Sequence, residues 1–173
     1  MASPQALSEQ ERRLVAAWAA NCAERVLPLF EAEAPADGRP RDAIARARAF
    51  ARGELATAGE IRRRFVANRA AKVVTTPAAK AAAWAAGQAA GVAHMGAHAL
   101  GAAAYAAKAA ALAGPDGAGP SEISWQLQQV SGPARAALKR LPRLGEDRAG
   151  PLGAGLLASG ALGANIRAIQ AAL

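Results

Sequence analysis

The chain has 173 residues with a formal net charge of +8 at pH 7, and its single cysteine, Cys22, excludes an internal disulfide. This length suits one helical domain spanning residues 1–173, which can bury about 70% of its unfolded surface. The N-terminal sequence lacks the apolar segment of a secretory signal. We therefore expect a cytoplasmic protein.

The positive charge raises the question of nucleic-acid binding, because a basic surface attracts phosphate groups. The basic residues are 17 arginines and 4 lysines in a chain rich in alanine, glycine and proline, as a GC-rich genome would encode whatever the function. Aromatic residues make up only 4%, and no RNP-like, zinc-finger or helix-turn-helix pattern accompanies the arginines. Nucleic acid is therefore the least favoured partner.

The first predicted helix begins at Ser8, which forms a capping box with Glu11. Pro28 is expected to kink or restart this helix, because proline removes a backbone donor and crowds the preceding turn. The predicted buried stripe has a three- to four-residue spacing and consists of Leu14 or Val15, Trp18, Cys22, Val26 and Leu29.

Two further helices are predicted before residue 70. One runs from Pro40 to about Arg52, and Gly53 ends it. The other begins at Thr57, which can form a capping box with Glu60. Ile61, Phe65 and Asn68 are predicted to share one face of this helix.

The next segment, between Lys80 and Lys108, contains no residue with a formal charge. It is long enough to span a membrane, but it has few large apolar side chains and has polar residues near its middle. A helix without a polar face belongs in a protein interior. We therefore predict no membrane span but a buried pair of helices, at 77–94 and 98–112. Thr75 and Thr76 mark the N cap of the first, and Gly96 separates the two.

Small residues recur along this central pair, at Gly87, Gly91 and Gly101. Each glycine inside a helix costs about 1 kcal/mol relative to alanine, so a compensating contact is expected. Close helix packing is one explanation. The other is that the small residues leave room for a ligand.

His94 and His98 form an H-x-x-x-H pattern, which on one unbroken helix would place two metal ligands on one side. No third ligand accompanies them, so we predict neither a metal nor a cofactor. Two roles remain for the pair: structural hydrogen bonds at the junction of the two helices, or a polar seam on a mostly apolar element, typical of a binding pocket. The candidate pocket residues are Trp84, Gln88, His94, His98, Tyr105 and Lys108.

After the loop at 114–120, Ser121 is predicted to cap a short helix. A basic helix follows Gly132-Pro133 and ends near Leu141, and a glycine-rich segment leads to a last helix through Ile166 and Ile169. No segment shows the alternation of a strand. The prediction is an all-α fold, a bundle of about six to eight helices around the Ala/Gly-rich central pair.

Signatures of common enzyme classes are missing: the chain has no G-x-S-x-G, P-loop or C-x-x-C motif. We therefore name no catalytic residue, and expect a binding protein rather than an enzyme.

Several unusual motifs occur in order, namely C-A-E-R-V-L-P-L-F from Cys22, R-P-R-x-A-I from Arg39, A-R-G-E from Ala51 and H-A-L-G-A-A-x-Y-A from His98. With Trp125-Gln126, they resemble the bacterial Imm5-like immunity proteins over residues 10–142. The resemblance implies a small cytoplasmic all-α protein that protects its producer from a toxin.

Two functions remain open. The first is binding and neutralisation of a cognate protein toxin without catalysis. The second is small-molecule binding, in self-resistance or in a biosynthetic cluster, at the seam around His94, His98 and Tyr105. A homodimer is compatible with both.

Overall fold

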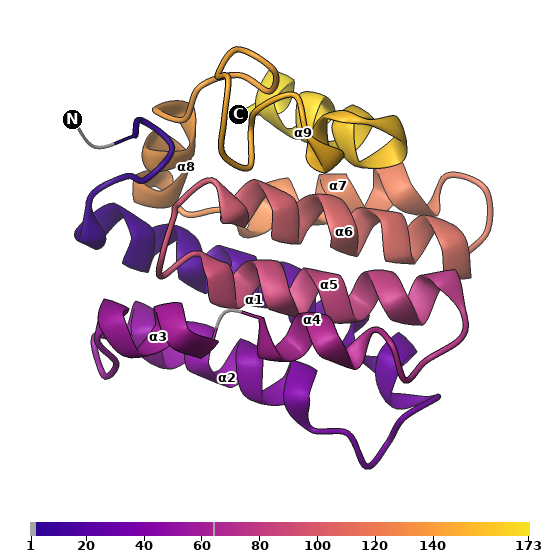
Figure 1. The fold of residues 1–173 in the computed structure, drawn as a ribbon. Coiled ribbons are helices and arrows are strands. Elements are labelled where there is room, and N and C mark those ends of the chain that lie inside the picture. The colour runs from indigo at the N-terminus through magenta and orange to yellow at the C-terminus, as the bar shows by residue number, and fades with distance from the viewer. Residues whose placement is uncertain (1–2, 64) are drawn as a thin grey trace.

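The computed structural model describes residues 3–63 and 65–173, and none of these residues lies in a strand. The predicted all-α multi-helix bundle is thus confirmed (Figure 1). The helices are α1 (Glu9–Glu31), α2 (Arg39–Ala51), α3 (Thr57–Arg63), α4 (Val66–Ala70), α5 (Pro77–Gly91), α6 (His98–Ala113), α7 (Ala118–Gln129), α8 (Gly132–Lys139) and α9 (Gly160–Ala172), with a 3-10 turn, η1, at Leu156–Ala158.

Helices α1, α5 and α6 pack against one another at the centre of the bundle. Helices α2 and α4 cover α5 on one side, while α7 and α9 pack against α6 on the other (Figure 1). Most residues of α5 and α6 are buried alanines and glycines. Within the described part of the chain, no helix combines the length and apolar content needed to cross a membrane.

The predicted starts of two helices are confirmed by their caps. The Ser8 hydroxyl accepts a hydrogen bond from the Glu11 N–H, while the Glu11 carboxylate accepts one from the Ser8 N–H. Thr76 accepts from the Ala79 N–H at the start of α5. Helix α1 continues past Pro28, which lies in its last turn, so no new helix starts there.

The predicted third helix is divided, because α3 ends at Arg63 and α4 begins at Val66. Both short helices contact α5, and α4 also packs against α2, whereas α3 is joined to α2 by two ion pairs. Phe65, predicted to share a face of one helix with Ile61 and Asn68, directly precedes α4 and is 51% exposed.

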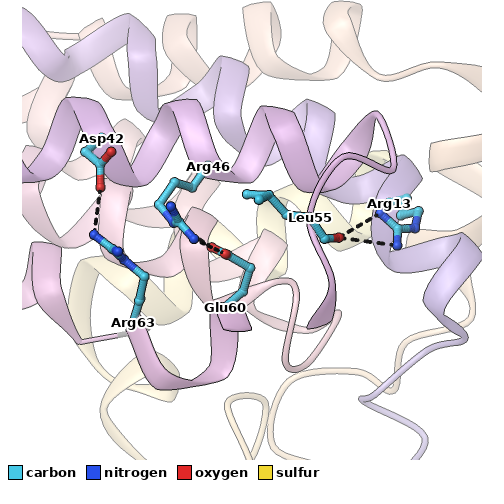
Figure 2. Close-up of polar contacts among 6 residues, drawn as sticks. All are labelled: Arg13, Asp42, Arg46, Leu55, Glu60 and Arg63. Carbon is cyan, nitrogen blue, oxygen red and sulfur yellow. Dashed lines mark hydrogen bonds and ion pairs between the residues drawn. The ribbon is translucent and has the colours of Figure 1, made fainter. Parts of the chain in front are cut away.

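Figure 2 shows the ion pairs that hold α3. The guanidinium group of Arg46, on α2, donates two hydrogen bonds to the Glu60 carboxylate, whose residue is 4% exposed. Arg63 reaches Asp42 at 3.5 Å. Glu60, expected in an exposed capping box, thus lies in a buried ion pair between two helices.

Helix α7 begins three residues before the predicted cap at Ser121. Gly117 precedes it with a φ of 85°, in the left-handed region that glycine adopts without a steric penalty. Further along, the Gln126 amide donates to the Ala103 carbonyl at 3.0 Å, and the Gln126 carbonyl accepts from the Trp18 indole at 2.8 Å. One buried residue thus links α7 to both α6 and α1.

Candidate functional site

A cavity of about 440 Å³ lies beside the bend between α5 and α6. Its inner wall comes from these helices and their connection, and its outer wall comes from the segment before α9. The lining residues are Trp84, Gln88, His94, Met95, His98, Tyr105, Gly150, Pro151, Gly155, Leu156 and Leu157. Below we call this the bend cavity.

The bend cavity brings together all the predicted pocket residues except Lys108. Tyr105 follows His98 by seven residues, or about two helical turns, so both side chains share one face of α6. Lys108 follows His98 by ten residues and is therefore rotated by about 80° around the helix axis.

Gln88 and His98 connect the two helices across the cavity wall. The Nδ1 atom of His98 lies 2.9 Å from the Gln88 side-chain oxygen. Because an amide oxygen can only accept, His98 donates through Nδ1 in this contact. The ring of His94 lies alongside, with the two imidazole centroids 6.5 Å apart.

The glycines of the central pair make room for these side chains. A Cβ atom on Gly101 would lie 2.2 Å from the Gln88 side-chain oxygen, and one on Gly91 would lie 3.0 Å from the His98 ring. Gly87 accommodates the side chain of Asn68 in the same way. The small residues thus accept polar side chains rather than only a neighbouring helix backbone.

An aromatic pair forms another part of the wall. The rings of Trp84 and Tyr105 stack with their centroids 5.9 Å apart and their planes 16° from parallel. Burial raises the pKa of the Tyr105 hydroxyl, so the group stays protonated at neutral pH. The cavity therefore presents flat aromatic surface with a neutral hydroxyl donor nearby.

The outer wall is held by a residue at the opposite end of the chain. The buried amide of Gln5 donates to the Asp147 carboxylate at 2.8 Å and to the Ala149 carbonyl at 2.7 Å, and accepts from the Leu152 N–H at 2.9 Å. These contacts hold the irregular segment at residues 147–152 in place, and this segment leads into the outer wall. Sequence reasoning missed this wall because the segment has no hydrophobic periodicity.

A second hollow, of about 460 Å³, lies where α4 and the following turn meet α5. Trp84 contributes to both hollows. The residues that line it are Phe65, Asn68, Arg69, Ala71, Lys72, Lys80 and Trp84. We call this the basic groove, because the described lining residues include three cations and no carboxylate.

The side chains of the described residues contain no group of three or more histidine, cysteine, aspartate or glutamate residues placed to hold a metal ion. The two histidines of the bend cavity have an amide, two aromatic rings and aliphatic groups around them instead. Such an arrangement can stack against a ligand and form hydrogen bonds with it.

Comparison with known proteins gives one match. The model of a family described as "Imm-5 like putative immunity protein" matches residues 5–133. No curated protein and no solved structure matches the chain. The matched range contains α1 to α7 and the inner wall of the bend cavity, and it ends before the outer wall at residues 150–157.

Proposed function

The chain belongs to the Imm-5 like immunity protein family, and we propose from this that it protects its producer by binding a protein toxin without catalysis. An inhibitor of this kind acts by covering a functional surface of the toxin or by holding it inactive. A few residues at the centre of such an interface supply most of the binding energy.

The observation that carries the proposal is the combination of apolar and cationic side chains at the basic groove. Phe65, which lines it, is 51% exposed, and Val73, beside Lys72 in the sequence, is 55% exposed. Large apolar side chains exposed together within a polar rim are typical of protein interaction sites. This surface therefore has the composition of a binding hot spot.

The cations around the groove favour a partner with an acidic surface. Arg69, Lys72 and Lys80 form no ion pair with any residue that the structure describes. An acidic toxin surface that inserts an apolar side chain beside Phe65 would complement them. Opposite charges would also accelerate association, most strongly at low ionic strength.

The test is co-expression with the toxin encoded beside the immunity gene in the producer's genome. We expect growth to be rescued, a stoichiometric complex to form and the mass of the toxin to remain unchanged. Failure of both rescue and complex formation would overturn the proposed function. Turnover of the toxin by a small fraction of this protein would overturn the non-catalytic mechanism.

Charge reversal tests the groove. The double variant Lys72→Glu/Lys80→Glu should weaken toxin binding by at least about tenfold. The matched control Lys139→Glu/Arg143→Glu reverses two exposed charges on and after α8, and should bind like the wild type. Equal binding by all three proteins would exclude the groove. If the protein alone forms a stable dimer whose interface covers Phe65, the groove would instead bind a second copy of this chain.

The bend cavity favours a second candidate function, the binding of a small molecule in self-resistance or biosynthesis. Its volume of about 440 Å³ is within the range of natural ligand pockets, and apolar walls surround a few polar groups. Native mass spectrometry of the protein purified from its producer would test this function, with a bound small molecule as the expected result.

A further inference from the structure

We infer that the bend cavity selects a neutral, planar aromatic molecule with a hydrogen-bonding group at one edge. This inference rests on the second candidate function and names the class of ligand. It is independent of whether a toxin binds at the basic groove.

The first argument is the shape and chemistry of the walls. Trp84 and Tyr105 form a stacked pair, and the rings of His94 and His98 lie at a tilt of 34° to each other. Aromatic faces favour other π systems in offset or edge-to-face arrangements. Most of the remaining lining is aliphatic or glycine. A flat ring would gain both stacking and apolar contact here.

The second argument is charge. No aspartate, glutamate, lysine or arginine occurs among the described residues that line the bend cavity. A charged ligand would lose its hydration on entry without an opposite charge to compensate, which is strongly unfavourable. This separates the bend cavity from the basic groove, whose cations suit an acidic partner. A neutral ligand is therefore expected.

The third argument is the placement of polar groups. The cavity lining includes the polar side chains of Gln88, His94, His98 and Tyr105, and the contact of 2.9 Å between His98 and Gln88 fixes two of them in position. A ligand hydroxyl or ring nitrogen can pair with such groups while the rest of the molecule stays among apolar side chains.

The outer wall provides residues that should report ligand binding. Leu156 is 66% exposed at the edge of the cavity, beside the buried Leu157. A bound ring would cover part of the Leu156 side chain. Backbone amides at residues 150–157 should therefore report binding, whereas amides of α2 should not.

The experiment compares three probes of similar size by calorimetry and by amide chemical shifts. They are 2-naphthol, the saturated decahydro-2-naphthol and the anionic 2-naphthoate. We expect 2-naphthol to bind at least about tenfold more tightly than either of the others, and to shift amides at 84–105 and 150–157. The saturated probe tests planarity, and the anion tests charge.

A substitution at the cavity edge localises the binding. Gly155 has a φ of −85° and no atom within 4 Å of the position that a Cβ atom would take, so Gly155→Trp should fill space without strain and abolish 2-naphthol binding. Gly132→Trp is the control, because Gly132 is equally open but lies at the start of α8. Both variants should retain wild-type unfolding midpoints.

The outcomes separate the two levels of the proposal. If decahydro-2-naphthol or 2-naphthoate binds in the cavity as tightly as 2-naphthol, the ligand class is wrong while the cavity remains a ligand site. If no probe perturbs the cavity and the producer's protein carries no small molecule, both the class and the second candidate function are overturned.

Discussion

The Nδ1 atom of His98, at the first residue of α6, lies 2.9 Å from the Oε1 atom of Gln88, near the end of α5. This contact joins the central helices beside their bend. It also orients both polar side chains in the wall of the cavity before any ligand is bound, which reduces the entropy lost on binding.

The substitution Gly101→Ala should disrupt this contact. The new methyl group would lie 2.2 Å from the Gln88 oxygen, so the Gln88 side chain must move away from His98. We expect a loss of about 1–2 kcal/mol in the free energy of unfolding, because overpacking outweighs the gain in helix propensity. Urea unfolding followed by circular dichroism measures it.

Gly59→Ala is the matched control for that substitution. Gly59 lies exposed in α3, with open space where a Cβ atom would stand. We expect a gain of about 0.5 kcal/mol from reduced freedom of the unfolded chain. A Gly101→Ala variant as stable as Gly59→Ala would contradict the close approach to Gln88.

Removing either member of the buried ion pair between Arg46 and Glu60 should reduce the stability of the protein, but by different amounts. Arg46→Met leaves the Glu60 carboxylate, 4% exposed, without its partner, and should destabilise the protein by about 2–4 kcal/mol. Glu60→Gln leaves a guanidinium group that is 26% exposed and can reach water, so the loss should be about 1 kcal/mol. Thermal unfolding compares the two variants.

The pair formed by Arg52 and Glu54 is the control for this comparison. Both side chains are more than half exposed, so Arg52→Met should leave stability unchanged within error. Equal losses from Arg46→Met and Glu60→Gln would show that burial of the carboxylate is not the dominant cost.

Glu33 should give stability a specific dependence on pH. Hydrogen bonds from the Thr75 and Thr76 backbone amides and hydroxyls lower the pKa of its carboxyl group from 4.5 to about 2. The unfolded chain takes up this proton near pH 4.5, whereas the folded chain does so only near pH 2. The stabilisation is therefore present above pH 4.5 and is lost as the pH falls towards 2.

Glu33→Gln removes this titration. The free energy of unfolding of the wild type should fall more steeply than that of the variant between pH 4.5 and pH 2, as measured by urea unfolding across the range. Parallel curves would refute the assignment.

Cys22 should be inert in the folded protein. Its side chain is fully buried in α1, and burial raises the pKa of the thiol well above its usual range. Labelling by a thiol reagent at pH 8 should be at least about 100-fold slower than in guanidinium chloride, because it requires unfolding. Ser121→Cys, at an exposed position, should label rapidly in the folded state.

Local signals were sufficient to predict the frame of the bundle. The caps at Ser8 and Thr76 depend on residues three positions apart, and the uncharged run between Lys80 and Lys108 required burial whatever its neighbours. Five of the six candidate pocket residues lie within this run, and these five line the bend cavity. Local pattern was informative because those residues lie on one continuous element and its bend.

The remaining features depend on contacts between distant parts of the chain. Gln5 holds Leu152 from 147 positions away, and no local pattern reveals such a pair. The ion pair between Arg46 and Glu60 likewise joins residues 14 positions apart on two helices. Lys108 lies on the same helix as His98 and Tyr105 but does not line the bend cavity.

The outer wall at residues 150–157 lies beyond the range of the family match, whereas the inner wall lies within it. The central helices thus supply one wall of the cavity, and a segment outside the matched range supplies the other. Rewriting this one short loop, with Gln5 left in place, would offer a way to retarget the cavity while preserving the helical scaffold.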